Sequence, residues 1–176
     1  ITCLCYKQDA NANNLLIGTS EGLIILNLST TEKKVMTGNS TNLKSFTNNY
    51  ITQIFQDSRG LIWVGTREGL NILNLETDEL DYLTEKQGLC NNNICGIAED
   101  KNHCIWVTTS RGVSRIVIQR NHEDAKNNYG LYNYTTADGL QSNEFNTGAI
   151  LTKQDGEVLL GGLYGVNWVL HRENAE

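Results

Sequence analysis

The sequence of 176 residues has no proline, one methionine, and no long run of apolar or of like-charged residues. Without a stretch of about 20 apolar residues, it encodes no transmembrane helix. Without a basic run, and with a net charge of −6, it is not expected to bind nucleic acid or an anionic membrane surface. No signal peptide is evident, and the sequence begins at Ile1 inside a strand-like pattern, so we expect a piece of a longer protein.

Helical periodicity is also missing. No window of about 12 or more residues has apolar residues at helical spacing. The apolar segments are short, rich in Ile, Val, Leu, Trp and Tyr, and separated by Gly, Asn and Asp, which is typical of β-strands. The sequences DSRG at 57–60 and KQDG at 153–156 suit tight turns, because glycine accepts a positive φ.

The cysteines and histidines do not form a metal-binding pattern. The five cysteines include no C-x-x-C pair, and the three histidines have no ligand spacing to them, so neither a metal site nor a cofactor is predicted. We expect the cysteines to be small buried hydrophobes, since a catalytic thiolate would lack a partner histidine in the sequence. The residues concerned are Cys3, Cys5, Cys90, Cys95, Cys104, His103, His122 and His171.

One stretch recurs along the chain. IWVGTREGLNILNL at 62–75 matches IWVTTSRGVSRIVI at 105–118, with Trp106 aligned to Trp63. Two further copies are LLIGTSEGLIILNL at 15–28 and VLLGGLYGVNWVL at 158–170. The apolar segments that precede the four copies are ITCLCYK at 1–7, ITQIFQD at 51–57, ICGIAED at 94–100 and TGAILTK at 147–153. The similar segments DYLTEKQGL at 81–89 and YNYTTADGL at 132–140 predict a more polar fourth strand.

The recurrence predicts four units, at 1-48, 49-91, 92-142 and 143-176. Four strands per unit and a period in the forties are typical of β-propeller blades. We therefore predict an all-β fold of about four four-stranded antiparallel blades, the last of which need not be complete, belonging to a larger propeller. The third unit is longer around QRNHEDAKNNYG at 119–130, which we interpret as an extended loop.

The apolar residues of the repeated stretch are expected to fill the space between blades. A blade is a small sheet that cannot bury both faces alone, so it needs neighbours on each side. Trp63 and Trp106, together with Ile17 and Leu160, are predicted to form this packing. Terminal blades of an open arc would leave apolar faces uncovered, so the chain should either pair with a second copy or show an exposed apolar end.

The pattern I-x-x-I-x-x-D-x-x-G-x-I-W-V-G-T-x-x-G-L, from Ile51 to Leu70, resembles the two-component regulator propeller repeat. The last unit, EFNTGAILTKQDGEVLLGGLYGVNWV at 144–169, is similar to the closing blade of that family. The first unit lacks the tryptophan. The third has Thr108 in place of glycine and Asn102 near the turn glycine.

The resemblance implies a setting rather than a chemistry. Members of the family are typically periplasmic sensor regions of hybrid two-component systems, anchored in the inner membrane, in which propellers precede an immunoglobulin-like domain and a kinase. It implies oligosaccharides as ligands, and the remaining blades and the immunoglobulin-like domain as partners within the protein. Kinase and receiver motifs lie outside this chain.

The T-x-x-G turns supply the candidate binding residues. Their two middle positions vary between units, and arginine or tyrosine there can bind sugar hydroxyls or uronic carboxylates. The alternative is that these are ordinary solvated turns. The candidates are Arg67, Glu68, Arg111 and Tyr164.

Two other functions are open to the sequence. A protein-interaction propeller would bring two copies together without a small-molecule ligand. A propeller lyase would need a histidine pair, but the three histidines are not at equivalent repeat positions. The neighbouring carboxylates Asp78 with Glu79, and Glu123 with Asp124, are expected to be loop charges rather than an acid–base couple. An enzyme is therefore not predicted.

Overall fold

The computed structural model describes residues 1–9, 12–38, 45–120 and 127–169, and their strands form four separate antiparallel sheets. Blade 1 contains β1 (Cys3–Asp9), β2 (Ala12–Thr19), β3 (Gly22–Asn27) and β4 (Lys33–Met36). Blade 2 contains β5 (Ile51–Gln56), β6 (Ile62–Thr66), β7 (Gly69–Asn74) and β8 (Glu79–Leu83). Blade 3 contains β9 (Ile94–Glu99), β10 (Ile105–Thr109), β11 (Gly112–Arg120) and β12 (Asn127–Tyr134). Blade 4 contains β13 (Phe145–Thr152), β14 (Val158–Gly162) and β15 (Gly165–Val169).

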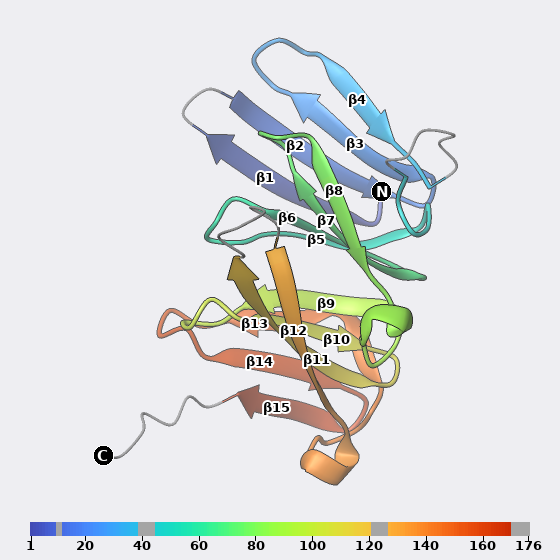
Figure 1. Ribbon diagram of the computed structural model, residues 1–176, viewed down its shortest axis with the longest axis vertical. Coiled ribbons are helices and arrows are strands. Elements are labelled where there is room, and N and C mark those ends of the chain that lie inside the picture. The colour runs from blue at the N-terminus through green and yellow to red at the C-terminus, as the bar shows by residue number, and fades with distance from the viewer. Residues whose placement is uncertain (10–11, 39–44, 121–126, 170–176) are drawn as a thin grey trace.

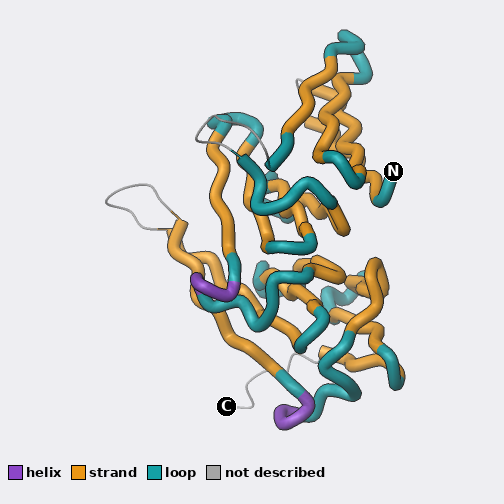
Figure 2. The backbone as a smooth tube through the Cα atoms, turned by 90° about the vertical axis from the view of Figure 1, so that its right-hand side faces the viewer, coloured by secondary structure: helices purple, strands orange, loops and turns teal. Residues whose placement is uncertain are grey.

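Each sheet is a simple meander, because strands that follow one another in sequence pair with one another. The blades are stacked in chain order, from the blue blade 1 to the red blade 4 in Figure 1, and Figure 2 shows the stack from the side. The first strands of successive blades contact one another: β1 with β5, β5 with β9, and β9 with β13. The prediction of an all-β chain of propeller blades is confirmed. Each sheet lies within one predicted unit, whose limits stay a prediction.

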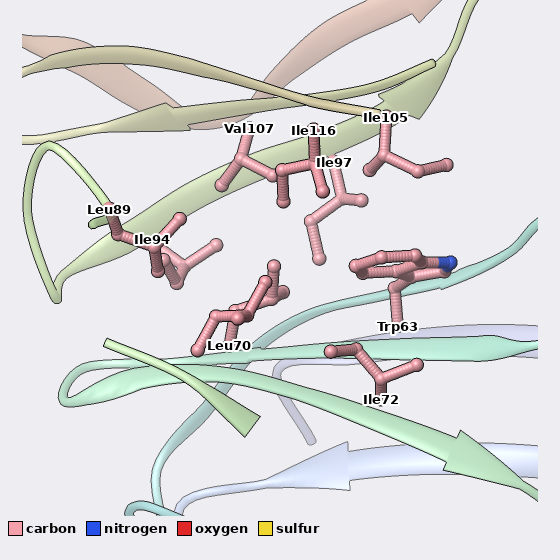
Figure 3. Close-up of a cluster of buried hydrophobic side chains, with 10 residues drawn as sticks. Trp63, Leu70, Ile72, Leu89, Ile94, Ile97, Ile105, Val107 and Ile116 are labelled. Atoms are coloured by element: carbon pink, nitrogen blue, oxygen red, sulfur yellow. The ribbon is translucent and has the colours of Figure 1, made fainter. Parts of the chain in front are cut away.

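A hydrophobic core fills each junction between blades. Between blades 2 and 3, Trp63, Leu70 and Ile72 point towards an array of aliphatic side chains on blade 3, as Figure 3 shows. Trp63 is fully buried, and Trp106 is 8% exposed in the junction between blades 3 and 4. The predicted role of both tryptophans in blade packing is confirmed. The blade 3 residues of the first core are Ile94, Ile97, Ile105, Val107 and Ile116.

Successive side chains along a strand point to opposite faces of its blade, and therefore towards different neighbouring blades. Leu16 on β2 is fully buried against blade 2, whereas its neighbour Ile17 points to the opposite face of blade 1 and is only half-buried. The prediction that Ile17 fills the space between blades stays a prediction, because Ile17 lies on the face of blade 1 that points away from blade 2. Leu160, the other aliphatic residue in that prediction, is 1% exposed and packs against blade 3.

The turns between the first and second strands have the expected backbone conformation. Gly60 has φ of 86° and Gly156 has φ of 81°. In blade 3 the equivalent position is held by His103, with φ of 60°, rather than by Asn102. A side chain at this left-handed position costs backbone energy that glycine avoids.

Three segments differ from the sequence-based predictions. The stretch at 119–130 is partly strand, since β11 continues to Arg120 and β12 begins at Asn127, and residues 121–126 lie outside the described ones. The longer hairpin packs on blade 2, where Tyr129 meets Trp63 edge-to-face at 6.3 Å between ring centroids. The polar segments at 81–89 and 132–140, predicted as fourth strands, are only partly strand. They end in single 3-10 turns, η1 (Glu85–Gln87) and η2 (Thr136–Asp138), each closed by a capping box.

Candidate functional site

One end of the blades gathers the variable residues of the repeat. We call it the connector face, comprising the turns at 20–21, 67–68, 110–111 and 163–164 and the connectors at 45–50, 84–93 and 135–144. In a four-stranded meander, the turn between the second and third strands lies at the same end as the segment leading to the next blade. The connector face therefore carries equivalent positions from successive blades side by side.

A threonine fixes the turn in each of the first three blades. The Thr66 hydroxyl donates to the carbonyl oxygen of Gly69 at 2.8 Å and accepts from the backbone N–H of Glu68 at 3.1 Å. Thr19 and Thr109 make the same pair of bonds in blades 1 and 3. The backbone frame is thus constant, and the two middle residues of each turn are left to vary.

A polar residue on the third strand fastens each connector. The backbone N–H groups of Thr47, Cys90 and Gln141 donate to Asn71, Ser114 and Asn167, over 2.9–3.0 Å. Asn71 and Ser114 are fully buried. These bonds hold the incoming connector against the turn of its blade. The connector face is therefore anchored to buried strands.

In blade 4, different residues hold the turn between the second and third strands. Gly162 replaces the turn threonine, and Gln141 occupies the space that the threonine side chain would need. The Gln141 side-chain oxygen accepts from the backbone N–H of Tyr164 at 2.7 Å. The glycine and the glutamine are thus matched substitutions that preserve the turn.

The four predicted residues all lie on the connector face and are exposed. Arg67 lies over the ring of Tyr50, with its guanidinium carbon 3.7 Å from the ring centroid, a cation–π contact that orients the guanidinium. Glu68, Arg111 and Tyr164 hold the second middle position of the turns in blades 2, 3 and 4, and Tyr164 is 80% exposed. The four residues thus lie on the turns of three consecutive blades.

Three further residues of this face were not predicted. Tyr50, Asn93 and Glu144 directly precede the first strand of blades 2, 3 and 4. Each contacts the first middle residue of its own turn: Tyr50 supports Arg67, Asn93 donates to the Ser110 hydroxyl, and the Glu144 carbonyl accepts from Leu163. Their shared place just before the repeated apolar segment is the sequence signal that could have identified them.

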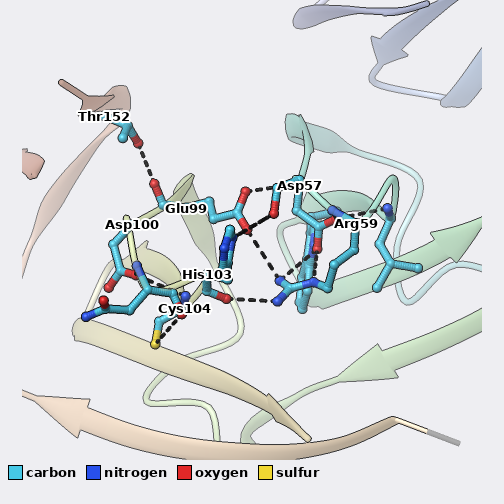
Figure 4. Close-up of polar contacts among 11 residues, drawn as sticks. Asp57, Arg59, Glu99, Asp100, His103, Cys104 and Thr152 are labelled. Atoms are coloured by element: carbon cyan, nitrogen blue, oxygen red, sulfur yellow. Dashed lines mark hydrogen bonds and ion pairs between the residues drawn. The ribbon is translucent and has the colours of Figure 1, made fainter. Parts of the chain in front are cut away.

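The opposite end of the blades carries a polar cluster around the turns at 57–61 and 100–104 (Figure 4). The buried Asp57 carboxylate accepts from the Trp63 indole N–H at 2.9 Å and from the guanidinium of Arg59. Asp100 accepts from Trp106 at 2.7 Å in the same way. Each aspartate thus joins its turn, through a hydrogen bond, to the tryptophan that packs against the next blade. The role of this cluster is structural.

Ser58, Glu99 and His103 in this cluster do not form a catalytic relay. Nδ1 of His103 lies 2.8 Å from Oγ of Ser58 and 3.2 Å from Oε1 of Glu99, so one ring nitrogen meets both groups. The Ser58 hydroxyl donates directly to Glu99 at 2.6 Å. A relay needs the serine and the carboxylate on different ring nitrogens. The contacts instead join the turns of blades 2 and 3.

The structure also bears on the metal-binding and catalytic residues considered in the sequence analysis. Within them, no three histidine, cysteine or carboxylate side chains gather as metal ligands. His122, Glu123, Asp124 and His171 lie outside the described residues. All five cysteines are free thiols, and Cys95 and Cys104 are buried. Burial raises the pKa of Cys3, Cys5 and Cys95, which disfavours the reactive thiolate.

Comparisons with known proteins agree with this architecture. The family model of the two component regulator propeller matches residues 45–68 and 88–111, each running from a connector to the turn of the following blade. No curated protein matches the sequence. Two solved structures are similar, both described as extracellular domains of hybrid two component systems from B. thetaiotaomicron. BT3049 has a TM-score of 0.53 at 20% identity, and BT4673 has 0.51 at 18%.

The chain spans only about a quarter of these two domains. The alignment covers 92% of this chain and 27% of the BT3049 domain, and 88% and 25% for BT4673. Among the described residues, no helix has the length and apolar character needed to cross a membrane. The family match falls on blades 2 and 3, and the sheet order agrees with it. The chain therefore has the fold of a β-propeller segment, in which two stretches, one leading into blade 2 and one into blade 3, match the two component regulator propeller model.

Proposed function

We propose that the chain is a periplasmic, non-catalytic sensor segment of a hybrid two-component protein, whose kinase lies outside it, and that its connector face contributes to oligosaccharide binding. The observation that carries the proposal is the constant backbone frame of the turns beneath exposed side chains that differ from blade to blade. A rigid frame with variable polar and aromatic residues suits recognition of a hydroxyl-rich ligand. The similar extracellular domains support the cellular setting.

Arg67 is the residue whose loss should reduce binding most. Its guanidinium is already oriented by Tyr50, so little side-chain entropy is lost when it binds a sugar hydroxyl or carboxylate. Calorimetry should be run on the full extracytoplasmic region, against a panel of neutral and uronate-containing oligosaccharides. We expect Arg67→Ala to weaken binding of the recognised glycan about tenfold or more, corresponding to about 1.4 kcal/mol.

Lys101→Ala is the matched control, because it removes one exposed positive charge at the opposite end of the blades. The control should bind like the unaltered region. Equal losses for both variants would contradict a connector-face site. Absence of heat with every glycan would favour the second candidate, an interaction propeller without a small-molecule ligand, which the exposed apolar faces of the end blades support. New reducing ends in the calorimetry samples would contradict the non-catalytic assignment and favour a lyase.

A further inference from the structure

A polar cavity of about 450 Å³ opens on the side of blade 1 that faces blade 2. The side chain of Ile25 on β3, which belongs to the core between the two blades, forms its floor. The cavity lies beside the β3–β4 turn, at the end of the blades opposite the connector face. Its volume is in the range of small-molecule sites. The other lining residues are Asn14, Asn27, Glu32, Lys33 and Lys34.

Blade 1 departs from the repeat at the residues that would otherwise fill this space. Leu16 stands where blade 2 has Trp63, and Asn14 stands where blade 2 has Leu61. Trp63 and Leu61 pack in the core between blades 2 and 3, and Tyr129 of the blade 3 hairpin covers Trp63. The corresponding hairpin of blade 2 is shorter, since β7 and β8 have 6 and 5 residues, whereas β11 and β12 have 9 and 8. A smaller side chain on blade 1 and a shorter hairpin on blade 2 thus leave the cavity open.

Two asparagine amides lie side by side on the cavity wall. Asn14 and Asn27 are register partners on β2 and β3, and both are half-buried. The Asn27 side-chain oxygen accepts from the backbone N–H groups of Ser29 and Thr30 at 2.9 and 3.0 Å, which fixes the orientation of its NH2 group. Within the described residues, neither this NH2 group nor the Asn14 amide has a hydrogen-bond partner. The pair suits a ligand that bears hydroxyl groups, since a hydroxyl both donates and accepts.

The charges around the cavity balance one another. The Lys34 ammonium lies 2.9 Å from Oδ1 of Asp78, on the turn between β7 and β8 of blade 2. Glu32 and Lys33 are neighbours at the start of β4 and carry opposite charges. A charged ligand would be attracted by one member of each pair and repelled by the other. The cavity therefore favours a neutral ligand.

We propose that this cavity binds a small neutral ligand rich in hydroxyl groups, of the class of the monosaccharides. The amides of Asn14 and Asn27 bond adjacent hydroxyls of the sugar ring, and Ile25 contacts the C–H groups of the ring. Glu32 and Lys33 at the rim accept from and donate to further hydroxyls. The cavity and the connector face lie at opposite ends of the blades, so this inference does not depend on the proposed role of that face.

Equilibrium dialysis of the full extracytoplasmic region against radiolabelled glucose, galactose and mannose tests the inference. We expect at least one of these sugars to bind. Asn14→Leu removes one amide and introduces the residue that blade 2 has at this position, so it should weaken binding about tenfold. Asn27→Asp keeps the oxygen that accepts from Ser29 and Thr30 but loses the NH2 donor, and should also weaken binding. Asn128→Leu, at an exposed position on outer strand β12, is the matched control and should bind like the unaltered region.

Several results would overturn the inference. One is that none of the three sugars binds at millimolar concentrations. Another is that glucuronate binds more tightly than the neutral sugars, which would contradict the preference for a neutral ligand. A third is that Asn128→Leu loses as much binding as Asn14→Leu. Circular dichroism of each variant separates loss of the site from loss of the fold.

The same samples distinguish the cavity from the connector face. If Arg67→Ala abolished sugar binding while Asn14→Leu and Asn27→Asp left it unchanged, the sugar would bind at the connector face, and the inference would be wrong while the proposed function stands. If the two asparagine variants lost the sugar while Arg67→Ala had no effect on any glycan, the cavity would be the binding site and the connector-face proposal would fail.

Discussion

Asp57→Ala is expected to lower the free energy of unfolding by about 2–3 kcal/mol, because it leaves buried hydrogen-bond donors without their acceptor. The Asp57 carboxylate is buried and accepts from the Trp63 indole, the Arg59 side chain, and the backbone N–H groups of Arg59 and Leu61. Alanine would leave the buried Trp63 indole N–H and two backbone N–H groups without their acceptor, whereas the partly exposed Arg59 keeps its bond to the carbonyl oxygen of His103. Urea unfolding followed by tryptophan fluorescence measures the effect.

Asp81→Ala is the control for this prediction. Asp81 is exposed, and its carboxylate accepts from the backbone N–H of Tyr82 at the outer edge of the same blade. Its replacement should change stability by about 0.5 kcal/mol or less. Asp57→Asn should fall between the two, because the amide keeps one acceptor oxygen but loses the charge that Arg59 pairs with. If Asp57→Ala and Asp81→Ala were equally stable, the aspartate–tryptophan pair would not be holding the turn to the junction.

Gly65→Val is expected to cost about 2–3 kcal/mol, because a side chain at this position overpacks the junction between blades 2 and 3. A Cβ atom at Gly65 would lie 2.6 Å from Cγ2 of Ile94, on the first strand of blade 3. Ile94 is fully buried and has little room to move. Gly130→Val is the control, since a Cβ there meets its neighbours at ordinary distances of 3.7–3.8 Å, and it should be nearly neutral.

A double-mutant cycle separates this clash from a general loss of sheet stability. Ile94→Ala alone should be destabilising by about 2–5 kcal/mol, because it leaves a cavity. In the presence of Gly65→Val the cavity is partly filled, so the double variant should be more stable than the sum of the two by about 1–2 kcal/mol. Additive effects would show that the two residues do not meet. Chemical denaturation of the four proteins provides the measurement.

Blade 3 contains a natural version of this compensation. Thr108 stands where Gly65 stands in blade 2, and its partner across the strands is Gly96, where blade 2 has Gln53. The glycine has moved from the second strand to the first, so the pair still holds one small residue. A Cβ at Gly96 would in turn lie 2.8 Å from Cγ2 of Ile150 in blade 4. The departure of the third unit from the repeat pattern is thus a reciprocal substitution.

The features that repeat could be predicted from the sequence. The strands, the turn glycines and the buried tryptophans all recur at matched positions, and a recurring pattern separates core from turn without any coordinates. The aspartate–tryptophan bond also lies within the repeated motif, at a fixed separation of six residues. It was missed because the spacing alone does not show that the turn folds back over the strand.

The features that do not repeat could not be predicted. Gln141 fills the space beside Gly162, and Tyr129 reaches Trp63 in the preceding blade, through contacts that depend on one blade only. The segment at 119–130 has the asparagines and charges of a loop. The sequence does not show that Ile118 and Tyr129 pair across the hairpin and pack on the core between blades 2 and 3. The candidate binding residues are exposed at turns, where the sequence constrains the backbone but not the ligand.

Amide hydrogen exchange tests the central claim most directly, namely that each sheet depends on neighbouring sheets for its stability. We predict the slowest exchange in β6, β7 and β10, whose blades are covered on both faces. The strands of blades 1 and 4 should open at a lower free energy, because one face of each is bare. Equal protection in all four blades, or a middle blade that opens before the end blades, would contradict the account.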